Sequence, residues 1–511
     1  MTQTPGGLDR PFLNIPDLIA QHGRYRPDHP AIVCEDRTVS WRDFAANVAR
    51  IAAALRGRGL RRGERVVVLM ENVPEALMAI LGIVRAGGCA VPLSTMLSPA
   101  QVAGLVGDSG AGLVLASNAC ADLLADLRGA DVVRHPSGWD AFMAQGGADL
   151  PPLSFAAEDE FNIIYSSGTT GLPKGIVQTH GAKLHFAVSN AIDLGITDEA
   201  RTLTTTALYS NGTWIVLLPT LIAGGTLHVM RAFGAEAFVN RVRDAAITHS
   251  FMVPAQFLMV LNSPAMDRAD FRSIHRLVCA GSPLRRDTKR AVLDRITPKL
   301  VELYGFSEGF ATMLRPGDQA RKFDTVGTPV LGYELRVIDD EGRECPPGTP
   351  GEIVGYGMGM MIGYNNRPDL TDELIWRDAA GRSFLRSGDI GVLDDDGFLR
   401  IVDRKKDMII SGGFNVFPTD VEAILGTHPA VLDVTVIGVP HERWGECCHA
   451  LIIPRDAAAP FDLDGFVTWA NARLSKPQRL GGAELRQDFP RNALGKVLKR
   501  VLRDPYWAGQ P

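Results

Sequence analysis

The sequence is poor in the features that mark secreted or nucleic-acid-binding proteins. Its seven cysteines among 511 residues show no repeated metal-ligand spacing, which favours a reduced protein with incidental thiols. The first residues contain neither a basic nor an apolar segment, so no secretory signal is expected. No basic run extends beyond short clusters such as 404–406, and the formal net charge is −5, which argues against a nucleic-acid partner. We therefore expect a cytoplasmic protein.

Long uninterrupted hydrophobic runs are also missing. The most apolar long stretch, Gly212 to Val229, is broken by Pro219 and by the pair Gly224-Gly225. Such breakers favour a buried helix and strand over a membrane span. With 46% hydrophobic and 22% charged residues, the composition is otherwise that of an ordinary globular protein.

The length of 511 residues predicts at least two domains, because one hydrophobic core rarely serves more than about 250 to 300 residues. Helix-like periods at 41–60 and 74–88 alternate with β-rich runs at 64–70 and 89–94. This alternation, which recurs from 200 to 310, is typical of βα units around a largely parallel sheet.

The second half of the chain has a different texture. From about residue 325, short β runs are separated by turn pairs such as Asp396-Gly397, which predicts an antiparallel subdomain. The last hundred residues mix helices and strands, and 504–511 is expected to be a loose tail. We predict an α/β fold with a large N-terminal domain of βα sheets plus an antiparallel β subdomain at 1–405. A small, mobile α+β C-terminal domain is predicted at 406–511.

One short stretch, YSSGTTGLPKG at 165–175, has the composition of an anion-binding loop. It is not a Walker loop, since Pro173 stands where a second glycine is required, and it is not a dinucleotide fingerprint. Glycines leave backbone N–H groups free to face an anion, while hydroxyls add donors and a lysine adds charge. The candidate phosphate-binding residues are Ser166, Ser167, Gly168, Thr169, Thr170, Gly171 and Lys174.

Four further motifs follow this loop in a fixed order. They are YGFSE at 304–308, SGD at 387–389, DRKKDMIISGGFNVFP at 403–418 and PRNALGKVLKR at 490–500, with a weaker GSPL match at 281–284. Taken singly, each is more ordinary: a turn, a charged surface segment or a solvated lysine. Together with the loop, the series resembles the adenylate-forming superfamily, which comprises acyl-CoA synthetases, peptide-synthetase adenylation domains and luciferases. It is most like a stand-alone acyl-CoA synthetase.

The resemblance implies a role for the residues in these motifs. The usual threonine of the third motif is replaced by Ser387, a change that leaves the carboxylate in place. The implied residues are Tyr304, Gly305 and Ser307 for adenine and phosphate, Gly281 and Ser282 beside them, Glu308 for Mg²⁺, Asp389 and Arg404 for ribose, Lys406 as the hinge between the domains, Gly412 and Gly413 for the CoA tunnel, and Lys496 for the adenylation step.

The reaction implied by the resemblance activates a small-molecule carboxylic acid with ATP, Mg²⁺ and CoA. The carboxylate attacks the α-phosphorus to give acyl-AMP and pyrophosphate, and the CoA thiol then takes the acyl group. Two like charges about 4 Å apart repel by roughly 4 kcal/mol at an effective dielectric of 20. Mg²⁺ on Glu308 and the ammonium of Lys496 are expected to offset this repulsion.

Other acceptors stay open at this point. An adenylating enzyme could pass the acyl group to an amine or a separate carrier protein, or act as a luciferase-like oxygenase. No carrier domain with its own serine follows residue 500, which argues against a built-in carrier. The presence of Glu308, Asp389 and Lys496 together argues against a nucleotide-binding protein without catalytic activity.

The acid pocket corresponds to ALYSNGTW at 207–214. Relatives that make CoA thioesters often carry an aromatic-His pair here. Tyr209 matches the aromatic residue, but Ser210 or a one-residue deletion takes the place of the His. Trp214 either lines the pocket, which would favour a flat aryl or a short to medium acyl group, or packs in the core behind it. No Asp or Glu occurs from 202 to 228, so an amino acid substrate would lack a counter-charge and is disfavoured.

Overall fold

The computed structural model describes residues 12–146, 153–166, 173–491 and 497–508. The chain forms two compact units. Unit 1 comprises Met1–Arg321, Pro329–Glu334 and Tyr356–Ile375, and unit 2 comprises Lys322–Thr328, Leu335–Gly355 and Trp376–Pro511. The predicted domain boundary between residues 405 and 406, with its hinge at Lys406, stays a prediction.

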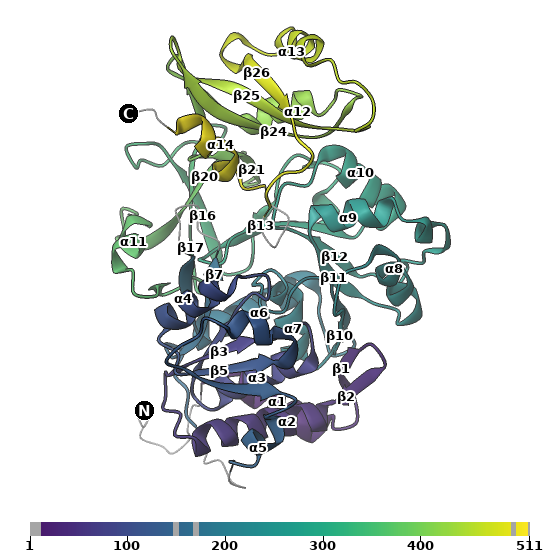
Figure 1. Ribbon diagram of the computed structural model, residues 1–511, viewed down its shortest axis with the longest axis vertical. Helices are drawn as coiled ribbons and strands as arrows, with labels where there is room; N and C mark the ends of the chain where they lie inside the picture. The colour runs from purple at the N-terminus through teal and green to yellow at the C-terminus, as the bar shows by residue number, and fades with distance from the viewer. Residues whose placement is uncertain (1–11, 147–152, 167–172, 492–496, 509–511) are drawn as a thin grey trace. The chain divides into compact units, whose positions relative to one another are not determined.

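A seven-stranded sheet in unit 1 carries the predicted phosphate loop (Figure 1). Strands β3, β4 and β5 pair in parallel, whereas β7 and β8 are antiparallel neighbours. The strand order is β18 (Gly363–Tyr364), β8 (Lys174–Thr179), β7 (Glu160–Ser166), β4 (Cys89–Pro92), β3 (Arg65–Leu69), β5 (Leu113–Ser117) and β6 (Asp131–His135).

A nine-stranded sheet forms the second layer. Its central strands from β1 to β13 are parallel to their neighbours, and β2 and β14 pair antiparallel near the edges. The strand order is β15 (Thr328–Pro329), β14 (Ala311–Leu314), β13 (Leu300–Gly305), β12 (Arg276–Cys279), β11 (His249–Met252), β9 (Arg201–Thr204), β10 (Thr226–Val229), β1 (Pro30–Cys34) and β2 (Arg37–Ser40).

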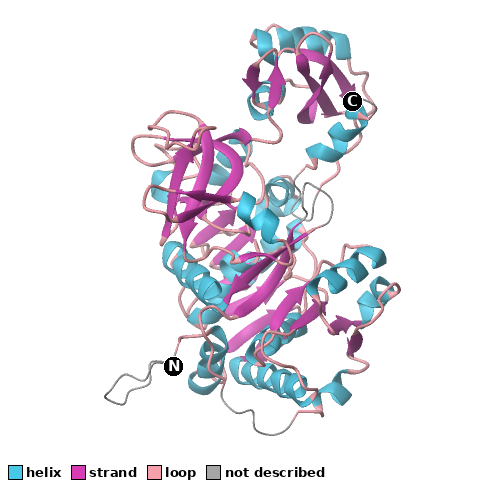
Figure 2. Cartoon of the chain, turned by 90° about the vertical axis from the view of Figure 1, so that its left-hand side faces the viewer, coloured by secondary structure: helices cyan, strands magenta, loops and turns pink. Residues whose placement is uncertain are grey.

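Helices cover both faces of these sheets, as Figure 2 shows. α3 is buried along almost its whole length, which is typical of a helix between two layers. The α-helices of unit 1 are α1 (Ile15–Tyr25), α2 (Trp41–Gly57), α3 (Pro74–Arg85), α4 (Pro99–Ser109), α5 (Trp139–Met143), α6 (His180–Leu194), α7 (Trp214–Ala223), α8 (Ala235–Asp244), α9 (Pro254–Leu261), α10 (Arg286–Arg295) and α11 (Pro368–Glu373). Short 3₁₀ helices span Asn118–Leu124, Pro264–Arg268 and Pro316–Asp318.

Hydrophobic cores hold the layers of unit 1 together. The largest joins α1, α2, α3 and α7 to inner faces of both sheets, through residues such as Trp41, Phe161 and Trp214. A second core packs α8, α9 and α10 against the nine-stranded sheet. A third packs α4 against the seven-stranded sheet. The apolar stretch 212–229 forms α7 and β10 within these cores, as predicted, and no helix in the described ranges is long and apolar enough to cross a membrane.

Unit 2 contains two five-stranded sheets. In the first, β16 (Tyr333–Ile338), β17 (Gly351–Gly357), β20 (Ser383–Leu393) and β19 (Ile375–Arg377) lie in that order, and β21 (Leu399–Arg404) pairs antiparallel with β20. The second has the order β23 (Phe414–Val416), β22 (Ile409–Ser411), β25 (Gly445–Pro454) and β24 (Val431–His441), with β26 (Leu480–Leu485) parallel to β25. The α-helices described in unit 2 are α12 (Pro418–Leu425), α13 (Leu463–Asn471) and α14 (Lys499–Trp507), and a short 3₁₀ helix spans Lys476–Gln478.

The predicted fold class is confirmed, including the antiparallel subdomain and the α+β C-terminal region. The prediction of a loose tail is wrong for residues 504 to 507, which end α14 despite Pro505. Leu502 of this helix is buried, and the indole of Trp507 donates a hydrogen bond to the Gly438 carbonyl at 3.1 Å. These contacts with β24 stabilise a helix that local sequence disfavours. All seven cysteines are free thiols, as expected.

Candidate active site

The predicted phosphate loop connects two antiparallel strands. Ser166 at the end of β7 pairs in register with Lys174 at the start of β8. Gly175 is closely packed: a Cβ there would lie 3.0 Å from the Ile163 side chain and 3.1 Å from that of Asn365, so a larger residue would require these neighbours to move by a few tenths of an ångström. The loop residues between the strands lie outside the described residues; they include the predicted Ser167, Gly168, Thr169, Thr170 and Gly171.

Three charged or aromatic side chains of unit 1 meet beside this loop. The Nζ atom of Lys174 lies 4.8 Å from the ring centre of Tyr364, and the Tyr364 hydroxyl donates a hydrogen bond of 2.8 Å to Oε1 of Glu308. Burial and the negative charge of Glu308 raise the pKa of the Tyr364 hydroxyl, so it stays a donor. The structure therefore brings the predicted phosphate lysine and the predicted magnesium carboxylate to the same ring.

Tyr364 is a functional candidate that the sequence analysis did not single out. It lies in β18, a strand of only two residues that pairs with β8 opposite Ile176. The chain just before Tyr364 also contacts the backbone of Glu308, because the Met361 N–H donates a hydrogen bond of 2.8 Å to the Glu308 carbonyl. The only sequence signal was the stretch GYNNRPDLT that contains it.

The other predicted nucleotide contacts of unit 1 follow neighbouring parallel strands. Gly281 and Ser282 come after β12, and the YGFSE segment begins in β13, so both lie at carboxyl ends on one edge of the sheet. This is the edge at which open α/β sheets bind ligands. Gly281 has a φ of +95°, a conformation that glycine adopts without strain. Ser307 is fixed by its carbonyl, which accepts a hydrogen bond of 3.1 Å from Gln178 Nε2.

Unit 2 holds the predicted ribose-binding residues together. Asp389 on β20 is opposite Arg404 on β21, and the Arg404 Nε atom lies 3.2 Å from Oδ1 of Asp389. Asp389 is 8% exposed, so its carboxylate is presented from a rigid strand pair. The hydroxyl of Ser387 donates to the Ile353 carbonyl at 2.7 Å and accepts from the Asp389 N–H. The Ser387 hydroxyl thus links β20 to β17 and holds the Asp389 backbone.

The predicted hinge residue Lys406 lies between β21 and β22 and has an exposed side chain. Its carbonyl accepts a hydrogen bond of 3.1 Å from Nη1 of Arg503 on α14. Gly412 and Gly413 form the two-residue turn between β22 and β23, with φ values of +59° and +84°. Two positive φ angles are typical of a type I′ hairpin, so this glycine pair has a structural reason as well as the predicted one.

The predicted adenylation residue Lys496 lies outside the described residues. The described chain resumes at Val497, and Lys499 follows at the start of α14. Lys499 Nζ forms an ion pair of 2.8 Å with Oε1 of Glu422 on α12, and both side chains are largely buried. This pair fixes the chain three residues after Lys496.

The predicted acid-pocket residues lie in two environments. Tyr209 and Ser210 are partly exposed in the loop after β9. Trp214 begins α7, is 1% exposed, donates its indole N–H to the Leu208 carbonyl at 2.8 Å and meets the edge of Phe161. These contacts are those that the core alternative predicts for Trp214.

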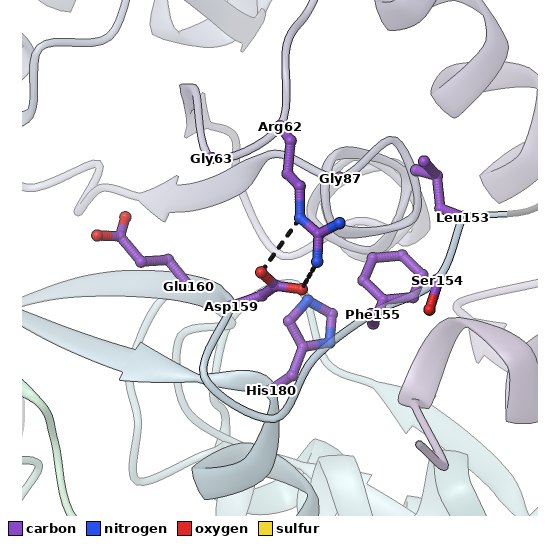
Figure 3. Close-up of a pocket in the computed structure, with 9 residues that line it drawn as sticks. All are labelled: Arg62, Gly63, Gly87, Leu153, Ser154, Phe155, Asp159, Glu160 and His180. Atoms are coloured by element: carbon purple, nitrogen blue, oxygen red, sulfur yellow. Dashed lines mark hydrogen bonds and ion pairs between the residues drawn. The ribbon is translucent and has the colours of Figure 1, made fainter. Parts of the chain in front are cut away.

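A small cavity, drawn in Figure 3, is lined by none of the predicted site residues. It has a volume of about 30 Å³ and is bordered by the ion pair of Arg62 and Asp159, by Phe155 and by His180. Burial lowers the pKa of His180 to about 4, and its buried Nδ1 atom has no hydrogen-bond partner among the described residues. The space suits one ordered water, not a nucleotide or an acyl chain.

The chain is similar to several known proteins over almost its whole length. The chain is 32% identical over 487 residues to a feruloyl-CoA synthase from an Amycolatopsis species, covering 94% of this chain and 97% of the relative. It is 32% identical over 505 residues to the fatty acid–[acyl-carrier-protein] ligase ScoC of Streptomyces coeruleorubidus, covering 95% of each. The o-succinylbenzoate coenzyme A synthetase MenE of Bacillus subtilis, solved with ATP and magnesium ion, superposes with a TM-score of 0.84 at 26% identity, over 95% of this chain and 98% of that one.

Family models match both parts of the chain. The model described as AMP-binding enzyme matches residues 19–365, and that described as AMP-binding enzyme C-terminal domain matches residues 420–496. The first match includes the phosphate loop, the YGFSE segment and Tyr364, and the second ends at the predicted adenylation lysine. The predicted resemblance is thereby confirmed, and the chain belongs to the AMP-binding enzyme family.

Proposed function

We propose that this protein is an AMP-forming acid:CoA ligase. The observation that carries the proposal is the meeting of Lys174, Tyr364 and Glu308 beside the loop between β7 and β8, in a chain of the AMP-binding enzyme family. A cation, a hydroxyl donor and a carboxylate at one place are what a magnesium-bound polyphosphate needs. The similar proteins named for CoA ligation support the choice of acceptor.

Glu308 would hold Mg²⁺ in this scheme. Mg²⁺ usually binds through one or two carboxylates together with substrate phosphates, instead of a cage of protein ligands. That preference fits Glu308, whose carboxylate is oriented by the hydrogen bond from the Tyr364 hydroxyl. When bound, the ion would neutralise charge on the phosphates.

The residues around the nucleotide would divide the remaining work. The N–H groups and hydroxyls of the loop, with Lys174, bind the β- and γ-phosphates that leave as pyrophosphate. Asp389, an acceptor-only group, receives the ribose hydroxyls, and Arg404 orients Asp389. Lys496 approaches the α-phosphate and stabilises the charge that builds there as the substrate carboxylate attacks.

The second step transfers the acyl group. The CoA sulfur attacks the acyl carbon, its proton is lost, and the bond from that carbon to the AMP oxygen breaks. We propose that the C-terminal region from 406 onward changes orientation at Lys406 between the steps, so that the Gly412-Gly413 turn borders the thiol's approach. Gly413 has no atoms within 4 Å of a Cβ position, which leaves room for a thin chain.

The experiment that tests the proposal measures pyrophosphate release and thioester formation over a panel of carboxylic acids. We expect pyrophosphate from at least one acid only when ATP and Mg²⁺ are present, and an acyl-CoA product only when CoA is added. A phosphopantetheinylated carrier protein replaces CoA in a parallel assay, because the similar protein ScoC is named for that acceptor. Faster acyl transfer to the carrier protein than to CoA would show that a carrier protein is the acceptor. The absence of pyrophosphate with every acid of the panel would refute ligase activity.

A further inference from the structure

Lys183 is a buried cation without a carboxylate partner among the described residues. It lies in the first turn of α6, is 1% exposed, and its burial lowers the pKa of its amine to about 7. A positive charge is also unfavourable near a helix N-terminus. A lysine in this position weakens the fold, and such positions are enriched in functional sites.

The contacts of the Lys183 amine point toward one neighbouring loop. Its Nζ atom donates a hydrogen bond of 2.7 Å to Oδ1 of Asn211. The centres of the Trp214 and Phe186 rings lie 5.1 and 5.2 Å from Nζ, so two aromatic rings also border the amine. Aromatic faces stabilise a cation but leave Asn211 as its hydrogen-bonded partner.

This hydrogen bond fixes which way the Asn211 amide faces. The Lys183 amine donates to Oδ1 of Asn211, so the oxygen of the amide faces the lysine and the NH₂ group faces away from it. Asn211 is partly exposed, and its Nδ2 atom has no hydrogen-bond partner in the part of the chain that the structure describes. The loop therefore offers an oriented donor at its surface, held from behind by a buried charge.

The loop that carries Asn211 follows β9, whose carboxyl end lies on the same edge of the sheet as those of β12 and β13. Tyr209 and Ser210, the predicted acid-pocket residues, directly precede Asn211 and are also partly exposed. An acid placed for activation near Glu308 would extend its tail along this edge.

We propose that Lys183 and Asn211 select acids whose tail carries a hydrogen-bond-accepting oxygen, such as a ketone, ether or second carboxylate. Asn211 contacts the oxygen through its NH₂ group, and Lys183 is a positioning residue that holds the amide in this orientation. The inference rests on the proposed ligase function and adds the substrate class. A purely hydrocarbon tail would desolvate the Asn211 donor without replacing its hydrogen bond to water, and such sites discriminate strongly.

The test compares kcat/KM for acids that differ at one group. Hexanoate, 5-oxohexanoate and hexanedioate form one matched set, and 4-ethylcinnamate and 4-methoxycinnamate form another. The parent enzyme should prefer the oxygen-bearing member of at least one set by about tenfold, the value of one well-placed hydrogen bond. Comparing hexanedioate with 5-oxohexanoate shows whether the site prefers the anionic oxygen of a carboxylate or the neutral oxygen of a ketone.

Two variants separate a specificity role from a structural one. Asn211→Asp keeps the shape of the side chain and gives Lys183 a carboxylate partner, so thermal stability should be retained or raised. The side-chain atom that faces outward becomes an acceptor in this variant. The ratio of kcat/KM for the oxygen-bearing acid to kcat/KM for the hydrocarbon acid should therefore fall below one. Lys183→Met releases the amide and should reduce the preference several-fold. A parent ratio near one in both sets, or an unchanged ratio in Asn211→Asp, would overturn the proposal while ligase activity stands. Absence of pyrophosphate with every acid would instead overturn the proposed function.

Discussion

Replacing Lys183 with methionine should stabilise the protein near neutral pH, by an amount that depends on pH. Methionine keeps an unbranched chain of similar length and removes the buried amine. The pKa of this amine falls from 10.5 to about 7 on folding. At about 1.36 kcal/mol per pKa unit, this difference corresponds to a cost of roughly 5 kcal/mol when the amine is protonated.

The pH range of this cost follows from proton binding. The folded state binds the proton more weakly than the unfolded state, so protonation favours unfolding. The cost is fully present below about pH 7, decreases as the pH rises from about 7 toward 10.5, and is absent above 10.5. The stability difference between the variant and the parent should therefore shrink by about 1.4 kcal/mol for each pH unit in this range.

Urea unfolding of both proteins, followed by tryptophan fluorescence at several pH values from about 7 to 9.5, measures this slope. Loss of the hydrogen bond to Asn211 also costs about 1 kcal/mol, but that loss shifts the difference equally at every pH. The slope is thus the diagnostic quantity. A stability difference that stays constant across this range would show that the Lys183 amine is not desolvated, and the reasoning would fail.

Four further predictions concern the proposed reaction. Lys496→Ala should slow pyrophosphate release by about 10² to 10³ while leaving CoA attack on supplied acyl-AMP nearly intact; release at the parent rate would refute the assignment. Lys406→Pro should preserve adenylation and reduce thioester formation, and equal loss in both assays would indicate general damage. Tyr364→Phe removes the donor to Glu308 and should raise the Mg²⁺ concentration needed for half-maximal pyrophosphate release by about tenfold, which a magnesium titration checks. Trp214→Ala should destabilise the fold by about 3 to 5 kcal/mol in urea unfolding if it packs in the core; a longer preferred acid in a stable variant would support the pocket alternative.

Local periodicity was sufficient to predict much of unit 1. The helices over 41–57 and 74–85 and the strands between them carry strong apolar patterns, and their neighbours in the sheets satisfy the same patterns. The tail was predicted wrongly because proline lowers helix propensity, whereas the buried Leu502 and the Trp507 hydrogen bond stabilise α14 through contacts about 70 residues away in sequence. Such tertiary contacts have no local signal.

The candidate site was predictable as a set of motifs but not as a set of contacts. Lys174, Glu308 and Tyr364 come from three segments far apart in sequence, and β18 is too short to show a strand pattern. Lys183 had a detectable signal. It begins a buried stripe of α6 that continues through Ala187, Asn190 and Leu194, where a lysine is out of place.

The charge around the predicted acid-pocket loop, 207–214, favours an oxygen-bearing tail over one that carries an ammonium group. The absence of Asp and Glu from 202 to 228 removes any local counter-charge for an amino group. The amine of Lys183 lies buried behind Asn211 and carries a positive charge below about pH 7, where an amino group nearby would experience like-charge repulsion in a region screened poorly by water. An oxygen-bearing tail would meet the opposite field, because the NH₂ group of Asn211 and the Lys183 ammonium both attract negative charge. The expected discrimination against amino acids and the proposed preference for oxygen therefore share one electrostatic origin, and Asn211→Asp should weaken both together.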